Sequence, residues 1–246
     1  MRQFGLIGKT LKHSFSKKYF TDKFDNEGIE DSNYKLFELA EISEIQNLID
    51  HFSDSLAGLN VTIPYKKEVM AFLDELDPKA EAIGAVNTIK VLAEGKLKGY
   101  NTDYLGFINS LQEGWNLEGK KALVLGTGGA SEAIKKALTD LKIPFQSVSR
   151  KKSDQSISYE DLNAKNWVET HQLIINTTPL GTYPEVATKP ALPYNQLSDQ
   201  HLLFDLVYNP EVTAFLQEGL NKGAQIKNGH QMLIGQAEAS WKIWND

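Results

Sequence analysis

The feature of the sequence that most constrains its fold is a strand–loop–helix–strand pattern in the second half. Ala122–Leu125 is apolar throughout, as buried strands of parallel sheets are. Gly126-Thr127-Gly128-Gly129 follows, Ala130–Leu141 has the pattern of a helix, and Phe145–Ser149 that of a second strand. Glycines between a strand and a helix allow a tight turn, and they let a pyrophosphate approach the helix N-terminus closely. The pattern therefore predicts a Rossmann-type dinucleotide-binding unit.

The glycine loop departs from the usual motif at its third glycine, where Ser131 stands. A tight turn with a purely structural role is the alternative to a phosphate loop, because short glycine motifs also occur by chance. The flanking elements favour the phosphate loop, since they follow one another in the order that a dinucleotide-binding fold requires.

The end of the second strand in this unit indicates which dinucleotide would bind. Folds that bind NAD usually carry Asp or Glu about 20 residues beyond the glycines, where it binds the ribose 2′-hydroxyl. Here the strand ends in Ser149-Arg150-Lys151-Lys152, and the next acid is Asp154. A guanidinium can pair with a 2′-phosphate through two hydrogen bonds, so this position favours NADP. The alternative is a solvated charge run, and the place of Arg150 at the strand end argues against it.

Composition restricts the classes of protein to which the chain can belong. Its 246 residues are 41% hydrophobic and 24% charged, values typical of globular domains. It has no cysteine, which excludes disulfides, thiolate catalysis and cysteine-ligated zinc, and we expect no metal site. The formal net charge of −6 argues against nucleic-acid binding. We identify neither a signal peptide nor a run of about 18 apolar residues, so we expect a cytoplasmic protein that does not bind membranes.

Strand-like and helix-like segments alternate along the whole chain, which predicts an α/β architecture with parallel pairing. The pattern restarts near residue 102, so we expect domains of residues 1–102 and 103–230, with a C-terminal helix at 231–246 that packs back on the first. Predicted strands are Gln3–Ile7, Tyr34–Leu39, Leu59–Ile63, Leu173–Ile175 and Leu202–Val207, with a hairpin of Thr88–Ala93 and Leu97–Asn101. Predicted helices are Phe15–Asn26, Ile42–His51, Lys66–Leu73, Tyr104–Glu113 and Gln231–Trp244.

Polar side chains at the predicted strand ends of the first half are candidates for substrate binding. Ser14 and Ser16 begin a helix, where two hydroxyls can bind a carboxylate, although capping of the helix by one serine is the simpler interpretation. Asn60 and Thr62 would share one face of a strand. Lys66 would begin the next helix, where an ammonium opposes the helix dipole, and this unfavourable position hints at a function.

Two further polar residues of this half stand beside small residues. Asn87 follows Gly84-Ala85-Val86, and Asp103 follows Asn101-Thr102. Taken alone, Asp103 is better explained as the N-cap of the predicted helix Tyr104–Glu113.

These segments, taken together and in order, resemble shikimate dehydrogenase. The resemblance spans nearly the whole chain, and an ordered set of motifs is far more specific than any one of them. The matching segments are Gly5–Gly8, His13–Ser16, Asn60–Lys66, Gly84–Thr88, Asn101–Asp103, Gly126–Ala130, Asp205–Pro210 and Met232–Ala237.

The resemblance implies a two-domain α/β fold, an N-terminal substrate domain and a Rossmann-type domain, with the active site in the cleft between them. It implies reduction of 3-dehydroshikimate to shikimate by NADPH, a step toward chorismate and the aromatic amino acids. It implies Lys66 and Asp103 as the catalytic pair. It implies that the substrate is bound by these two residues and by Ser14, Ser16, Thr62, Asn87, Tyr208 and Gln236. It implies cofactor contacts from Gly126, Thr127, Gly128, Gly129, Ala130, Ser149, Arg150, Lys151, Gly229 and Met232.

The sequence departs from the family's pattern in two places. Lys17 and Phe20-Thr21 replace a proline and a histidine-asparagine pair that often follow the two serines, which leaves the placement of the first helix less certain. Asn176-Thr177-Thr178-Pro179 replaces an asparagine-alanine-threonine-serine segment, so we assign this loop no detailed contacts.

Alternatives to this function differ in cofactor or in catalysis. A quinate/shikimate dehydrogenase that uses NAD is disfavoured by Arg150 and by the missing acid at the strand end. A non-catalytic NADP-binding sensor is disfavoured by the presence of both Lys66 and Asp103. We expect a monomer or a homodimer. Trp241 and Trp244 in the last helix fit a core position or a dimer contact, and we favour the core.

Overall fold

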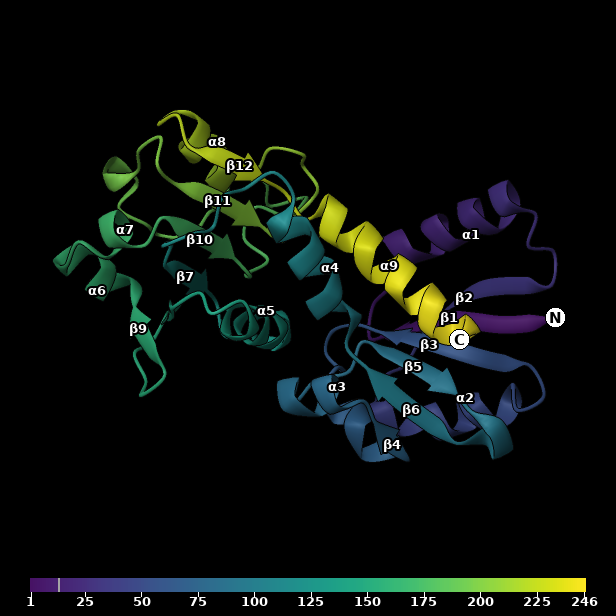
Figure 1. Ribbon diagram of the computed structural model, residues 1–246. Coiled ribbons are helices and arrows are strands. Elements are labelled where there is room, and N and C mark those ends of the chain that lie inside the picture. The colour runs from purple at the N-terminus through teal and green to yellow at the C-terminus, as the bar shows by residue number, and fades with distance from the viewer. Residues whose placement is uncertain (13) are drawn as a thin grey trace. The chain divides into compact units, whose positions relative to one another are not determined.

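The computed structural model describes residues 1–12 and 14–246, so His13 of the matching segments lies outside the described residues. The contacts divide the chain into two units (Figure 1). The first unit comprises Met1–Thr102 and Gln236–Asp246, and the second comprises Asp103–Gly235. Helix α9 (His230–Asn245) contributes its first residues to the second unit and the rest to the first.

The first unit contains a six-stranded mixed sheet of order β2-β1-β3-β5-β6-β4. Strand β1 pairs in parallel with β2 and β3, whereas β5 pairs antiparallel with β3 and β6. The antiparallel pairing of β5 with β6 confirms the predicted hairpin, whereas the antiparallel pairing of β5 with β3 departs from the predicted parallel pattern. The strands are β1 (Arg2–Gly8), β2 (Ser32–Glu38), β3 (Leu56–Val61), β4 (Glu75–Leu76), β5 (Thr88–Val91) and β6 (Leu97–Tyr100).

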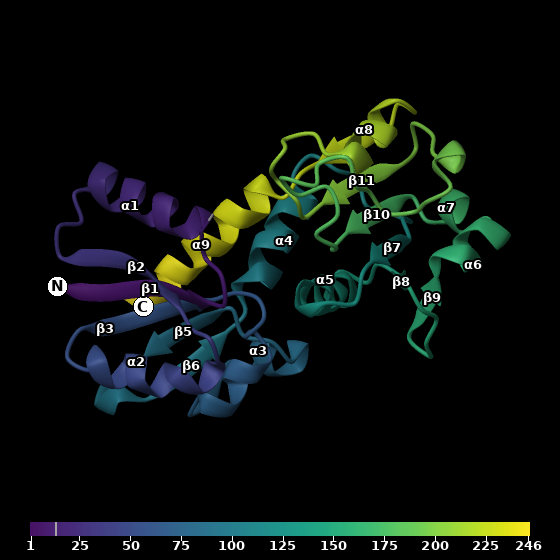
Figure 2. The same ribbon diagram turned by 180° about the vertical axis from the view of Figure 1, so that it is seen from behind.

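Helices cover both faces of this sheet (Figures 1 and 2). On one face, α1 (Phe15–Glu27) and the end of α9 pack aromatic side chains on β1. The other face is covered by α2 (Ile45–His51) and α3 (Pro78–Ile83), together with the short 3-10 helices η1 (Ile42–Glu44) and η2 (Glu68–Phe72). Trp244 is buried and donates a hydrogen bond to the Ile89 carbonyl at 2.9 Å, so this tryptophan is a core residue, as we favoured.

The second unit contains a six-stranded sheet of order β12-β11-β10-β7-β8-β9, in which every pair is parallel. Its central strands are apolar because helices cover both faces, and this is the reason that the sequence showed them as continuous hydrophobic runs. The strands are β7 (Ala122–Leu125), β8 (Phe145–Ser149), β9 (Ser156–Ser158), β10 (Leu173–Asn176), β11 (Leu202–Asp205) and β12 (Gln225–Lys227).

Helices α4 (Thr102–Gln112) and α5 (Gly129–Asp140) share one face of this sheet. Phe107 of α4 meets Phe204 of β11 edge-on at 5.1 Å between ring centroids, and the Tyr104 hydroxyl donates to Asp140 of α5 at 2.6 Å. The opposite face carries α6 (Tyr159–Ala164), α7 (Trp167–Thr170) and α8 (Ala214–Leu220). Two more 3-10 helices, η3 (Ala93–Gly95) and η4 (Tyr194–Gln196), lie in connections.

The predicted elements agree with the structure where the sequence pattern is long. The bounds of β7 and β8 are those predicted, and α5 and α9 each differ by one residue at either end. The predicted helix Lys66–Leu73 is wrong, because only the 3-10 helix η2 forms there. Sequence patterns missed the short elements, since segments of two to seven residues show too little periodicity to be distinguished from loops. The missed elements are β4, α3, β9, α6, α7, α8 and β12.

Candidate active site

The glycine loop between β7 and α5 has one glycine that the fold requires and two that it does not. Gly126 has φ of +111°, and a Cβ there would lie 2.7 Å from the Thr177 Oγ1 atom. At Gly128 and Gly129, an added Cβ would meet nothing within 4 Å among the described residues. The N-cap of α5 is Gly128, which has no side chain to accept from the helix, and the Ser131 N–H donates to the Gly128 carbonyl. The N–H groups of Gly129 and Ala130 and the positive dipole end are therefore available to an anion. Packing leaves open space where a pyrophosphate would lie, and the loop fits a dinucleotide.

Ser131, which replaces the third glycine, also fits this loop. Its side chain is fully buried, and its hydroxyl donates to the Gly128 carbonyl at 2.6 Å. The serine therefore braces the loop from inside, and its small side chain still lets α5 pack closely on the sheet.

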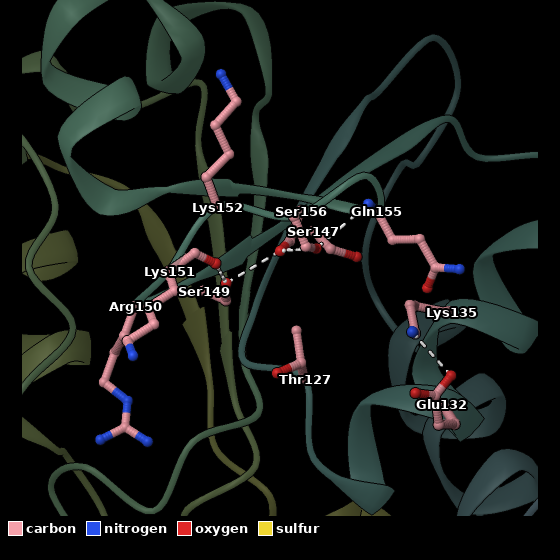
Figure 3. Close-up of a pocket in the computed structure, with 11 residues that line it drawn as sticks. Thr127, Glu132, Lys135, Ser147, Ser149, Arg150, Lys151, Lys152, Gln155 and Ser156 are labelled. Atoms are coloured by element: carbon pink, nitrogen blue, oxygen red, sulfur yellow. Dashed lines mark hydrogen bonds and ion pairs between the residues drawn. The ribbon is translucent and has the colours of Figure 1, made fainter.

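A cavity of about 790 Å³ lies beside the glycine loop (Figure 3). Four of the predicted cofactor residues line it: Thr127 of the loop, Ser149, Arg150 and Lys151. Its lining residues are Thr127, Glu132, Lys135, Ser147, Ser149, Arg150, Lys151, Lys152, Ser153, Gln155 and Ser156. Four lysine or arginine side chains against one carboxylate make the lining basic, as a phosphate group requires.

Hydrogen bonds hold the turn that carries these basic residues. The Ser149 hydroxyl donates to the Lys151 carbonyl and lies 3.0 Å from the Ser156 hydroxyl, which is 2.8 Å from that of Ser153. Figure 3 shows Ser149 and Ser156 in the middle of the cavity wall, with the side chains of Arg150 and Lys152 extending in opposite directions. The turn therefore presents Arg150 at the end of β8, in the place that the sequence predicted.

The carboxylate of the lining comes from α5. Glu132 lies in the first turn of α5, and the Lys135 ammonium is 2.8 Å from its carboxylate (Figure 3). Sequence reasoning missed both residues as pocket residues. Their i, i+3 spacing near the start of the helix after the glycine loop was the available signal, because residues so spaced lie on one face.

The loops after β10 and β11 meet at the buried carboxylate of Asp205. Its side chain is 0% exposed and accepts hydrogen bonds from Asn176 Nδ2 at 2.9 Å, from the Val207 N–H at 3.0 Å and from the Thr213 hydroxyl at 2.6 Å. Burial raises the pKa of Asp205 to about 6, and the three hydrogen bonds oppose this shift. Tyr208 follows in the same loop and is half-buried, which raises the pKa of its hydroxyl.

Gly229 borders this region in the second unit. A Cβ at Gly229 would lie 2.1 Å from the Leu206 carbonyl oxygen, so the backbone before α9 packs directly on the loop after β11. The Gly229 N–H also donates to the Val207 carbonyl at 3.2 Å. Met232 is buried at the start of α9.

In the first unit, backbone hydrogen bonds bring Thr62, Lys66 and Asn87 together at the carboxyl ends of β1 and β3. The Thr62 N–H donates to the Ile7 carbonyl at 2.9 Å, and the Val86 N–H donates to the Lys66 carbonyl at 2.7 Å. The Asn87 carbonyl accepts from the Val61 N–H at 2.8 Å. Three of the predicted substrate-binding residues therefore lie on adjoining segments.

Ser14 and Ser16 lie at the start of α1. Ser14 is the N-cap, and its hydroxyl accepts from the Lys17 N–H at 3.4 Å, as the capping interpretation predicted. Ser16 is hydrogen-bonded to the hydroxyl of buried Tyr34, which donates to Asn60 Oδ1 at 2.8 Å. Burial raises the pKa of Tyr34. Asn60 is thus engaged inside the unit, whereas Thr62 beyond it is half-exposed.

Three more of the predicted residues lie just before η2, in α4 and in α9. Lys66 is half-buried just before η2, and Asp103 is the second residue of α4. The prediction that Asp103 caps a helix beginning at Tyr104 is wrong, because the helix already includes Thr102. Gln236 is 7% exposed on α9. Lys66 and Gln236 belong to the first unit, and Asp103 belongs to the second.

Comparison with known proteins identifies the family. Residues 6–89 match the model of the shikimate dehydrogenase substrate binding domain. A shikimate dehydrogenase (NADP(+)) of Clostridium beijerinckii is 40% identical, and the match covers 100% of this chain and 93% of the relative. The chain belongs to the shikimate dehydrogenase family.

Solved structures agree with this assignment. Shikimate dehydrogenase 1 from Peptoclostridium difficile has a TM-score of 0.86 and 40% identity, covering 100% of this chain and 92% of that one. The Thermus thermophilus enzyme, solved in complex with NADP(H) and shikimate, has a TM-score of 0.86 and 29% identity, covering 99% and 93%. The α/β fold with a Rossmann-like unit, predicted from the sequence, is confirmed. No helix among the described residues is both long and apolar enough to cross a membrane.

Proposed function

We propose that this member of the shikimate dehydrogenase family catalyses the NADPH-dependent reduction of 3-dehydroshikimate to shikimate, in the biosynthesis of chorismate and the aromatic amino acids. The observation that carries the cofactor assignment is the basic cavity beside the glycine loop. In this loop the fold does not require glycine at Gly128 or at Gly129. NADPH supplies the hydride for this reaction. The residues of the chain bind and orient the substrate and the cofactor, and they donate the proton.

We propose that the second unit binds NADP(H). Gly128, Gly129 and the uncapped N-terminus of α5 would bind the pyrophosphate. Arg150 would pair with the 2′-phosphate through two hydrogen bonds, with Lys151 and the Ser149 turn beside it. In folds that bind NAD, an Asp or Glu at this position accepts a hydrogen bond from the ribose 2′-hydroxyl, and Arg150 cannot accept one. This is the reason for proposing NADP rather than NAD.

We propose that the first unit binds the substrate. The hydroxyls of Ser14 and Ser16 would bind its carboxylate at the N-terminus of α1, and Thr62, Asn87 and Gln236 would bind the ring hydroxyls. Support comes from the adjoining positions of these segments at the strand ends and from the match of residues 6–89 to a substrate binding domain. Tyr208 would contact the substrate from the loop after β11.

We propose that Lys66 and Asp103 are the acid–base pair. As hydride reaches the ketone carbon, negative charge develops on the ketone oxygen. An ammonium directed at that oxygen stabilises the charge and can deliver the proton, a role that Lys66 would fill. A carboxylate nearby favours the protonated form of an amine, and this is the role of Asp103.

The test is the absorbance of the nicotinamide with purified protein and shikimate, comparing NADP and NAD at equal concentrations. The proposal predicts turnover with NADP and little with NAD, and no NADPH consumption without the ketone. Equal rates with both cofactors would contradict the role of Arg150, and no turnover with either would contradict the reaction. A mass measurement in solution would decide between the monomer and the homodimer, and fractionation would test the expected cytoplasmic location.

A further inference from the structure

A cluster of buried hydroxyl and amide groups lies inside the first unit, behind the predicted substrate residues. Thr88, Thr102 and Ser240 are all 0% exposed, and Asn60 and Asn87 are 4% and 3% exposed. Of these five, the predicted substrate contacts include Asn87 alone. Buried polar groups need hydrogen-bond partners, so the arrangement of the cluster shows which groups remain for a ligand.

The side-chain oxygen of Asn87 is held by donors from one side. It accepts from the Thr102 N–H at 2.7 Å, and the hydroxyls of Thr102 and Thr88 each lie 3.1 Å from it. A backbone N–H can only donate, so the atom of the amide that faces it must be the oxygen. The opposite amide orientation would place an NH₂ group against this N–H. The donor character of this N–H therefore fixes the orientation of the Asn87 amide.

The Asn87 amide nitrogen consequently points away from the cluster. Among residues 1–12 and 14–246, no residue accepts a hydrogen bond from Asn87 Nδ2, and this nitrogen is not one of the fully buried side-chain atoms. The atom is therefore within reach of a ligand, although the residue as a whole is only 3% exposed. A ligand with a lone pair would supply the missing acceptor.

The cluster also connects Asn87 to helix α9. The Ser240 hydroxyl donates to the Gln236 carbonyl at 2.8 Å, and it has a single proton. Its oxygen must therefore accept from its other neighbours, which are Thr88 at 2.8 Å, Thr102 at 3.1 Å and Asn60 Nδ2 at 3.0 Å. Thr88 lies nearer to Ser240 than Thr102 does, so the Thr88 hydroxyl donates to Ser240 and the Thr102 hydroxyl remains to donate to Asn87.

We propose that Thr102 is a positioning residue for substrate binding, which with Thr88 and Ser240 fixes Asn87 so that it acts only as a hydrogen-bond donor. The inference rests on the proposed function and specifies the chemistry at one contact. The ring hydroxyl that faces Asn87 accepts a hydrogen bond through its oxygen. Thr102 itself does not touch the substrate and acts through Asn87.

The test compares Thr102→Val with Thr102→Ser. Valine keeps the shape and the backbone N–H but removes the hydroxyl, whereas serine keeps the hydroxyl. We expect Thr102→Val to raise the KM for shikimate about fivefold, the effect of losing one neutral hydrogen bond. The KM for NADP should change less than twofold, and Thr102→Ser should restore the KM for shikimate. A purely structural role would lower the amount of active enzyme without this separation of the two KM values.

Shikimate analogues that lack one ring hydroxyl each provide a second measurement. The analogue missing the hydroxyl that faces Asn87 should lose affinity in the wild type and lose less in Thr102→Val, because the two changes remove the same interaction. If Thr102→Val does not fold, Thr102→Ala also removes the hydroxyl and should act in the same direction.

Three results would overturn the inference. The first is an unchanged KM for shikimate in Thr102→Val or Thr102→Ala, and the second is equal damage from serine and valine at position 102. Both apply with an active wild type, and they leave the proposed function intact. The third is a wild type without turnover of shikimate, which would overturn the proposed function and this inference with it.

Discussion

The buried carboxylate of Asp205 makes the stability of the second unit depend on pH in an unusual direction. Its pKa is raised to about 6 from an ordinary value of 3.8, because burial disfavours the charged form. The folded protein therefore binds this proton more tightly than the unfolded chain does. The resulting stabilisation is fully present below the unfolded pKa and is lost as pH rises through about 6. The difference between the two pKa values corresponds to about 3 kcal/mol at neutral pH.

Replacing Asp205 with asparagine removes this titration and keeps most of the contacts. The amide oxygen can still accept from Asn176 and from the Val207 N–H, and the Thr213 hydroxyl can turn to accept from the new NH₂ group. We expect the free energy of unfolding of the wild type, minus that of Asp205→Asn, to fall by about 2–3 kcal/mol between pH 4 and pH 7. Urea unfolding at several pH values measures this difference.

Asp161→Asn is the matched control for that experiment. Asp161 accepts from the Ser158 N–H at 2.9 Å in a capping box, and this hydrogen bond lowers the pKa of its carboxyl. Its contribution is therefore present at neutral pH and lost as pH falls, which is the opposite trend. A difference for Asp205→Asn that stays flat or grows with pH would show that burial does not govern the titration of Asp205.

The other predictions concern catalysis, cofactor choice and packing. Lys66→Met should lower kcat at least about 100-fold with a smaller change in KM, because it removes the proposed proton donor. Lys67→Met is the control and should leave kcat near that of the wild type, and equal rates for both variants would exclude Lys66 as the acid. Arg150→Ala should lower the preference for NADP over NAD about 10- to 100-fold in kcat/KM, the loss of charge-assisted hydrogen bonds, and an unchanged ratio would place the 2′-phosphate elsewhere. Gly229→Ala should destabilise the protein by about 1–3 kcal/mol in urea unfolding, because its Cβ would lie 2.1 Å from the Leu206 carbonyl oxygen, and an unchanged midpoint would contradict this close packing.

The sequence predicted the parts of the fold whose signal is local and repeated. The unit from β7 through α5 to β8 combines a buried apolar run, a glycine loop and a helix of twelve residues, and all three were placed correctly. The segment after Pro64 gave a wrong helix, because one turn of apolar residues such as Val69 and Met70 fits a 3-10 helix as well as an α-helix. The run Leu202–Val207 read as one strand, but β11 ends at Asp205, whose buried carboxylate accepts from the Val207 N–H and so takes this donor from the ladder.

The candidate site was predicted where a motif falls on one segment and missed where the contact depends on packing. Arg150 was placed in the cavity from its position at a strand end. Lys135, Gln155 and Ser156 were not, since they reach the cavity from α5 and from the turn into β9, and neither segment carries a pattern that points to a ligand. The role of Thr102 was also beyond the sequence, because it depends on the direction of a hydrogen bond to Asn87.

The glycines of this chain show how a structure can separate residues that the fold needs from residues that a ligand needs. Gly126 and Gly229 are crowded by other atoms of the chain, so any side chain there would displace backbone or neighbouring loops. Gly128 and Gly129 have open space where a side chain would go, and neither has a positive φ that would favour glycine. Folding alone would therefore tolerate alanine at these two positions. The proposed NADP(H) accounts for the absence of side chains there, because its pyrophosphate must approach the backbone closely, and the uncapped N-terminus of α5 beside them favours an anion.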